Sequence, residues 1–106
     1  MATQFVLDTA SGLEVSFAYG NPTVSHDVLN SGDEGGYCEV TAWVDGYEVG
    51  RQQVWAEALS YAMFSFDLGV LYPGPHRLDV AVAPPDETGS PALAADFEVA
   101  ATEPLA

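Results

Sequence analysis

Two histidines are the residues of this sequence whose chemistry would best suit catalysis or metal binding. Imidazole titrates near neutral pH and ligates transition metals, so His26 and His76 could serve together as metal ligands or as an acid and a base. However, no third ligand lies at a metal-binding spacing from either of them. In an extended strand, His26 would also point to the same side as the apolar Val24, and His76 to the same side as Leu78. We therefore expect structural histidines at the entry to two strands.

Cys38 is the only cysteine, so no disulfide can form within the chain. A nucleophilic cysteine needs an electropositive, partly exposed setting that lowers its pKa. Cys38 instead shares the alternation of Val40 and Ala42, which predicts burial as a small apolar side chain. No Ser/His/Asp set, Cys/His set or glycine-rich phosphate loop is evident. We expect no catalytic residues.

Four carboxylates in two acidic loops form a candidate site for a hard cation. Asp33 and Glu34 lie between glycines, and Asp86 and Glu87 lie between prolines and Gly89. If both loops emerge at the same end of the fold, their oxygens could bind Ca²⁺, which takes about six to eight oxygen ligands. No Asp-x-Asp-x-Asp spacing is present. The alternative is that both loops are solvated and protect edge strands from aggregation.

Outward aromatic residues could form a surface for a partner. The period-two alternation turns four large side chains away from the apolar side of their strands: Tyr37, Trp43, Tyr61 and Met63. On a sheet face open to water they would make one exposed patch, and such patches mark contact sites. Tyr and Trp also suit carbohydrate or peptide, because each has a flat apolar body and a polar tip. The alternative is that Trp55 or the N-terminal segment covers this face.

The charge balance narrows the class of partner. The chain has 16 acidic residues, two basic ones (Arg51 and Arg77) and a formal net charge of −14. We expect no binding to nucleic acid or to anionic membranes, because both need basic side chains. A cationic partner, a divalent ion or a neutral ligand is compatible with this charge. Apart from the charge argument, we expect a protein partner or self-association, with carbohydrate as a further candidate. The simplest interpretation is a solvated surface, on which Arg77 pairs with Asp79 for about 0–1 kcal/mol.

The length of 106 residues fits a single domain, which we place at residues 1–106 with a frayed tail from about residue 101. We expect no signal peptide in this chain and no membrane insertion, because no apolar run approaches the roughly 18 residues of a span. The sequence leaves the location in the cell open.

Turn residues recur between short alternating segments, which is the pattern of an all-β sandwich or barrel. Asp45-Gly46 separates two such segments and predicts a two-residue hairpin, because both central residues need a positive φ. Turns are also expected at residues 9–12 and 20–22. We predict a two-sheet antiparallel β-sandwich of seven to eight strands, over residues 4–7, 13–19, 24–29, 37–44, 47–54, 60–68, 77–82 and 93–99.

Three segments resemble a known family. Residues 28–32 (VLNSG) are similar to its V-x-N-x-G strand end, residues 40–50 (VTAWVDGYEVG) to its Asp-Gly hairpin, and residues 73–80 (PGPHRLDV) to the entry of a late strand. Together they resemble the CARDB-type domain, the cell-adhesion-related module of bacteria and archaea. The resemblance implies a seven-stranded immunoglobulin-like sandwich with a non-catalytic role in adhesion or interaction. Residues 85–97 and the strand at 4–7 depart from the family pattern.

Three functional hypotheses follow. The leading one is a non-catalytic interaction module for adhesion, assembly or decoration, which binds a partner through a sheet face or a loop end. The second is a protein that binds a small ligand or a divalent cation. The third is a small β-scaffold enzyme that has no recognisable catalytic motif.

Overall fold

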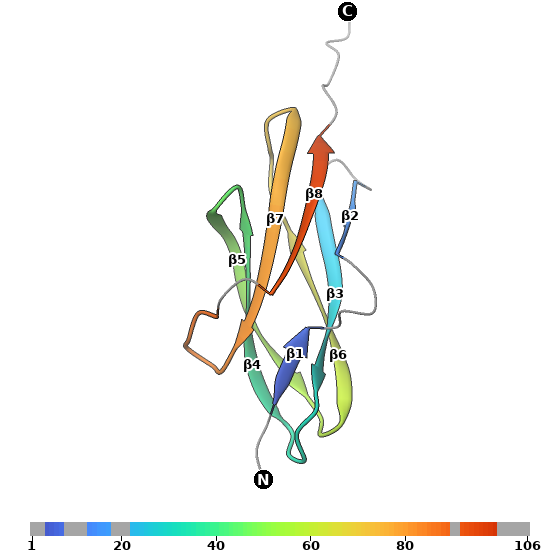
Figure 1. The fold of residues 1–106 in the computed structure, drawn as a ribbon, viewed down its shortest axis with the longest axis vertical. Helices are drawn as coiled ribbons and strands as arrows, with labels where there is room; N and C mark the ends of the chain where they lie inside the picture. Colours follow the sequence, from blue (N-terminus) through green and yellow to red (C-terminus); the bar gives the residue numbers. More distant parts are fainter. Residues whose placement is uncertain (1–3, 8–12, 18–21, 90–91, 100–106) are drawn as a thin grey trace, which may run out of the picture.

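The computed structural model describes residues 4–7, 13–17, 22–89 and 92–99. No helix in this part of the chain is long and apolar enough to cross a membrane. The turn predicted at 9–12, most of the turn at 20–22 and the tail from residue 101 lie outside it. The described residues contain eight strands (Figure 1), namely β1 (Phe5–Leu7), β2 (Glu14–Ser16), β3 (Thr23–Asn30), β4 (Gly36–Val44), β5 (Tyr47–Ala56), β6 (Ser60–Asp67), β7 (Gly74–Ala83) and β8 (Leu93–Val99).

The strands form two antiparallel sheets. In sheet A, β3 lies between β6 on one side and both β1 and β2 on the other. In sheet B the strand order is β5-β4-β7-β8. The predicted all-β, immunoglobulin-like two-sheet sandwich is therefore confirmed. The consecutive strands β5 and β6 belong to different sheets, so the chain crosses from sheet B to sheet A between residues 56 and 60.

Alternate side chains of the two sheets fill the core, as the period-two pattern predicts. Sheet B contributes the fully buried Val40, Leu78 and Val80. Sheet A contributes buried side chains from β3 and β6, namely Val24, Val28, Phe64 and Phe66. Burying one such side chain stabilises the fold by about 1.5–3 kcal/mol, which exceeds the contribution of a surface ion pair. The apolar core therefore holds the two sheets together.

The β4–β5 hairpin turns at Asp45 and Gly46, whose φ angles are 53° and 86°. Both angles are positive, so the predicted two-residue turn is confirmed. Further along the hairpin, the pairing register shifts between Ala42 and Trp43, which marks a β-bulge. One extra residue of β5 is accommodated there. The bulge therefore changes which side chains of β5 face outward.

Asn30 joins several elements at one end of the sandwich. Its side chain is fully buried, and both of its polar atoms are hydrogen-bonded. Its Oδ1 accepts from the backbone N–H groups of Gln4 at 3.2 Å and Gly32 at 3.0 Å. Its Nδ2 donates to the carbonyl oxygens of Glu34 at 2.7 Å and Ala56 at 3.1 Å. One side chain thus ties the segment before β1, the β3–β4 loop and the end of β5 to β3.

Candidate functional site

The four side chains predicted to form one patch lie on two different sheets. Tyr37 and Trp43 face outward from sheet B, where Tyr37 is half exposed and Trp43 is partly buried between Glu48 and Asp79 on the neighbouring strands. The other two, Tyr61 and Met63, face outward from sheet A. The prediction of a single patch is wrong, because the outer faces of a sandwich point away from each other.

Sheet A carries a group of outward apolar side chains, here named the apolar strip: Val6, Leu29, Tyr61 and Met63. The strand register places Val6 of β1 beside Leu29 of β3, and Leu29 beside Tyr61 of β6. Met63 follows two residues after Tyr61 on the same face of β6. The exposed fractions are 43% for Val6, 59% for Tyr61 and 75% for Met63. The strip is therefore a continuous apolar surface across three strands.

Sheet B carries a different aromatic group, here named the aromatic pair: Tyr37 and Trp55. The two residues are direct cross-strand partners, and their rings meet edge to face with centroids 5.0 Å apart. Both remain about half exposed. The indole Nε1–H of Trp55 donates to Glu57 Oε1 at 3.0 Å. Sequence alternation indicated Trp55 only as a cover for this face, so the aromatic pair was not predicted.

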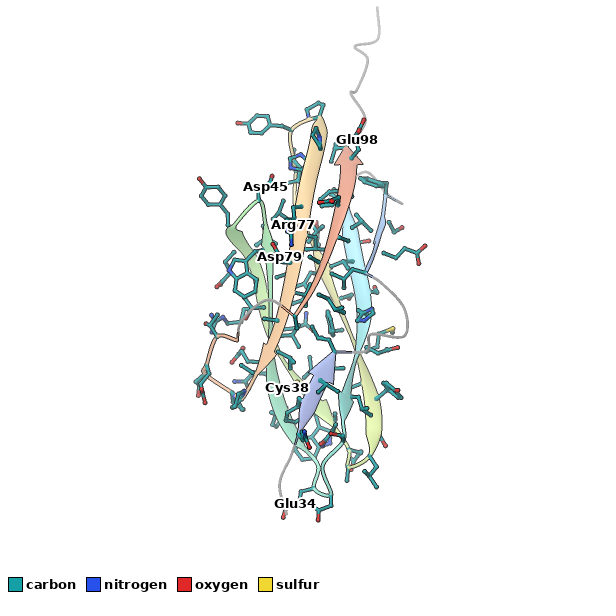
Figure 2. All side chains as sticks on the ribbon, in the orientation of Figure 1. Glu34, Cys38, Asp45, Arg77, Asp79 and Glu98 are labelled. Carbon is teal, nitrogen blue, oxygen red and sulfur yellow. The ribbon has the colours of Figure 1, made fainter. Side chains whose placement is uncertain are left out.

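The acidic loops do not form the predicted group of four carboxylates. Among the described residues, no three His, Cys, Asp or Glu side chains gather as they would around a metal ion. The loop of Asp33 and Glu34 closes one end of the sandwich, where Figure 2 shows Glu34. The loop of Asp86 and Glu87 is tied to the outer face of sheet B, where the N–H of Asp86 donates to buried Glu39 at 2.9 Å. This hydrogen bond holds the second loop against β4.

Both arginines of the chain are engaged with groups of the chain itself. Arg51 donates to the hydroxyl of Thr88 and forms an ion pair with Glu48 at 3.3 Å. Arg77 forms the predicted ion pair with Asp79, also at 3.3 Å (Figure 2). Each arginine is therefore already paired within the fold.

Cys38 is fully buried in the core, as its alternation predicts. Burial, and secondly the negative charge of Glu39, raises the pKa of the thiol to about 11. Thiolate is the reactive form of cysteine and is scarce at neutral pH under these conditions. The side chain therefore packs the core and does not act as a nucleophile.

His76 joins two turns at the end of the sandwich opposite Asn30. Its Nδ1 lies 2.6 Å from Asp45 Oδ2, and its Nε2 lies 2.6 Å from the carbonyl oxygen of Tyr72. Both partners are acceptors, so the geometry favours the doubly protonated ring. The Tyr72 carbonyl and then the Asp45 carboxylate raise the pKa of His76. The backbone N–H of Arg77 and then His76 lower the pKa of Asp45.

The two histidines pack separately, each within its own sheet. His76 of sheet B stacks on Phe97 with ring centroids 5.6 Å apart. His26 of sheet A is buried and packs edge-on against Phe64 at 6.2 Å. These contacts are those of structural histidines at strand positions.

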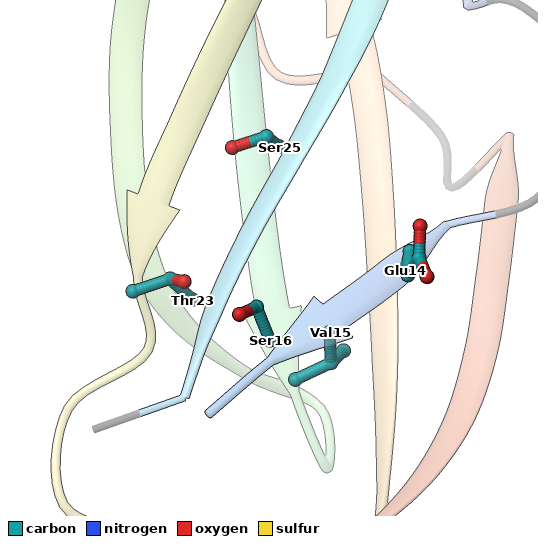
Figure 3. A pocket seen from close by; sticks show the side chains of 5 residues that line it. All are labelled: Glu14, Val15, Ser16, Thr23 and Ser25. Carbon is teal, nitrogen blue, oxygen red and sulfur yellow. The ribbon is translucent and has the colours of Figure 1, made fainter. Parts of the chain in front are cut away.

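A hollow of about 460 Å³ lies beside β2 and the start of β3 (Figure 3). Its lining combines the hydroxyl groups of Ser16, Thr23 and Ser25 with Val15 and the carboxylate of Glu14. These lining residues include no histidine, cysteine or lysine to activate a hydroxyl group. Among the described residues, the hollow therefore offers hydroxyl groups and one carboxylate for polar contacts.

Comparisons with known proteins agree with this class of fold. No protein-family model and no curated protein match the sequence. Among solved structures, the chain is similar to a CARDB domain from Pyrococcus furiosus in complex with di-metal ions, with a TM-score of 0.64, 14% identity and coverage of 92% of each chain. It is also similar to the β-glucosidase DesR from Streptomyces venezuelae, in complex with D-glucose (TM-score 0.73), and to a β-glucosidase from Kluyveromyces marxianus (TM-score 0.67), each at 18% identity.

These similarities define the chain in two steps. It is an immunoglobulin-like β-sandwich, and within that class its fold is that of a CARDB domain, so the resemblance inferred from three short segments is confirmed for the fold. The matches to the β-glucosidases cover 92% of this chain but only 15% and 14% of the enzymes. At these identities the similarity shows the fold alone.

Proposed function

We propose that the chain is a non-catalytic interaction module that binds a protein partner through the apolar strip of sheet A. The similarity to a CARDB domain over 92% of both chains supports a module of this general kind. The β-glucosidase matches show the same fold as a small part of much longer chains. They do not extend glucoside hydrolysis to this chain, because they include only about one seventh of each enzyme.

The observation that carries the proposal is the exposure of Val6, Tyr61 and Met63 on one continuous surface. Folded proteins bury large apolar side chains, and connected groups of them on the surface mark contact sites. The residues of the strip come from three strands of one sheet, so folding itself positions them. A partner can dock on this surface without any rearrangement of the domain.

The charge of the chain selects the kind of partner. At −14, two copies repel each other, and so do acidic partners. A neutral or basic protein avoids this repulsion and gains from electrostatic steering. The proposed partner is therefore a different protein surface of neutral or positive charge, and self-association is the outcome to be tested against it.

The test compares Met63→Glu with the matched control Val70→Glu. Both positions are highly exposed, at 75% and 90%, and both changes add one negative charge, but only Met63 belongs to the strip. Each variant serves as bait for affinity capture, and sedimentation velocity measures self-association in parallel. We expect wild type and Val70→Glu to retain the same partner and Met63→Glu to lose it. Equal capture by all three baits would contradict the proposal, and concentration-dependent dimers abolished by Met63→Glu would replace it with self-association.

Divalent-cation binding is a second candidate, favoured by the metal ions in the similar CARDB structure. Asp33, Glu34, Asp86 and Glu87 remain its proposed ligands, and Ca²⁺ would have to draw their two loops together. A calcium titration followed by thermal melting tests this, because a ligand of the folded state raises the melting temperature. An unchanged melting temperature at millimolar calcium would reject it.

A further inference from the structure

The aromatic pair lies on the face opposite the apolar strip, so it belongs to a different surface from that of the proposed function. Tyr37 and Trp55 are 53% and 47% exposed, although they are among the largest side chains of the chain. Trp55 lies on β5, an edge strand of sheet B, so one side of the pair has no neighbouring strand (Figure 1). Two aromatic rings are therefore held together where a ligand can reach them.

Glu57 makes this pair more than an apolar contact. Its carboxylate accepts the indole N–H of Trp55 at 3.0 Å, which fixes the ring and directs negative charge toward it. Gly35 lies under the side chains of Trp55 and Glu57. A Cβ at Gly35 would lie 3.0 Å from Trp55 Cζ2 and 3.4 Å from Glu57 Oε2. Trp55 and Glu57 thus pack closely over Gly35, the residue just before β4, and a side chain there would have to displace them slightly.

The chemistry of these groups selects a cation. The faces of aromatic rings carry negative potential, and a carboxylate at the ring edge adds a full negative charge beside them. The backbone of the nearby loop is held close to this end of β5, because the carbonyl oxygens of Glu34 and Ala56 both accept from the Asn30 amide. The group contains acceptors and aromatic rings but neither arginine of the chain, since Arg51 and Arg77 pair elsewhere.

A neutral sugar fits this group less well. Sugar sites present a flat ring platform with both hydrogen-bond donors and acceptors for the hydroxyl groups. Here the rings meet edge to face at 73°, and the indole donor is already bound to Glu57, so the Tyr37 hydroxyl is the donor that the group still offers. A cation needs neither a flat platform nor a donor.

We propose that Tyr37, Trp55 and Glu57 bind the guanidinium or ammonium group of an arginine or lysine side chain on a partner protein. The net charge of −14 draws basic segments to the surface, and the aromatic pair gives one cationic side chain a defined place on it. The contact combines a cation–π interaction with an ion pair to Glu57.

The test follows the indole N–H signals of the intact chain by NMR while a hexa-arginine peptide with uncharged, blocked ends is added. Trp43 serves as an internal control, and a Trp43→Phe variant assigns the two signals. We expect a saturable shift of the Trp55 signal that weakens as salt is added. Trp55→Ala and Glu57→Gln should each raise the Kd for the peptide about fivefold to thirtyfold. Because Trp55→Ala has lost the indole signal, its binding is followed through the backbone amides of β4.

Glu98→Gln is the matched control, since it removes one charge at the opposite end of the sandwich (Figure 2). We expect it to leave the Kd within about twofold of wild type, because exposed charges beyond a Debye length are screened. Equal losses in Glu57→Gln and Glu98→Gln would show that only net charge attracts the peptide. No saturable shift, or a shift caused by a neutral hexasaccharide and not by the peptide, would also overturn the proposal. None of these outcomes depends on the capture experiment with Met63, because the two surfaces are separate.

Discussion

Replacing Asn30 with aspartate tests how one buried amide holds the end of the sandwich. The change keeps the shape of the side chain and the two hydrogen bonds accepted by Oδ1 from Gln4 and Gly32. It replaces Nδ2, which donates at 2.7 Å to Glu34 and at 3.1 Å to Ala56, with an oxygen that faces two carbonyl oxygens. The perturbation is therefore electrostatic rather than steric.

The magnitude follows from the two states open to the new carboxyl group. If it stays ionised, a buried and uncompensated charge costs about 3–5 kcal/mol. If it is protonated at pH 7, raising its pKa from an ordinary value of about 3.9 costs about 4 kcal/mol. Its single O–H also satisfies only one carbonyl, and the other orphaned carbonyl costs about 1–3 kcal/mol more. By either route the loss is at least about 3 kcal/mol, which is large against a total stability of about 5–15 kcal/mol.

Urea unfolding monitored by tryptophan fluorescence measures this loss. Ser65→Asp is the control, because it adds the same charge at an exposed position of sheet A and should stay within about 0.5 kcal/mol of wild type. The folded state raises the pKa of the new carboxyl group, so the deficit should grow as pH rises above about 4 and shrink below it. A loss under about 1 kcal/mol at pH 7, or a deficit that does not shrink in acid, would refute the reasoning.

Three further predictions test other contacts of the fold. A Cβ at Gly50 would lie 2.6 Å from Phe66 Cδ1, so Gly50→Ala should lower the free energy of unfolding in urea by about 1–3 kcal/mol. The loss should be much smaller when Phe66→Leu makes room for the new methyl group. A Gly50→Ala variant as stable as wild type, or more stable, would contradict this. The pKa of His76 is raised by folding, so its stabilising effect is present below about pH 6.5 and is lost as pH rises through the folded-state pKa. The melting temperature of wild type should therefore be higher in mild acid than in base, and His76→Gln should lack this difference. The same difference in both proteins would contradict the prediction. The raised pKa and burial of Cys38 predict no reaction of the native chain with a thiol reagent until it unfolds, and rapid native modification would contradict that.

The strands and the hairpin could be predicted because their causes are local. Alternating burial along β3 and β6 is visible in the residue types themselves, and the positive φ angles of Asp45 and Gly46 follow from the needs of a two-residue turn. The burial of Cys38 follows from the same alternation. Each of these features depends only on a residue and its near neighbours in sequence.

The partner surfaces could not be predicted in the same way, because they depend on which sheet each strand joins. Alternation shows that Tyr61 and Met63 face away from the core, but it does not show that β6 pairs with β3 instead of β5. The acidic loops were misplaced for a related reason. The hydrogen bond from Asp86 to Glu39 joins residues 47 positions apart, and nothing local to either residue signals it.

The bulge in the β4–β5 hairpin explains why the aromatic pair in particular escapes a local analysis. Counted from the Asp45-Gly46 turn without interruption, Tyr37 would face Val54, and Trp55 would share the inner face with Cys38. The register shift at Ala42 adds one residue to β5, so Val54 pairs with Cys38 and Trp55 pairs with Tyr37 on the outer face. A single extra residue thus buries the valine and exposes the tryptophan beside Glu57. Deleting Val49, which lies between the residues paired with Trp43 and Ala42, would therefore turn Trp55 toward the core and remove both the aromatic pair and its proposed cation site.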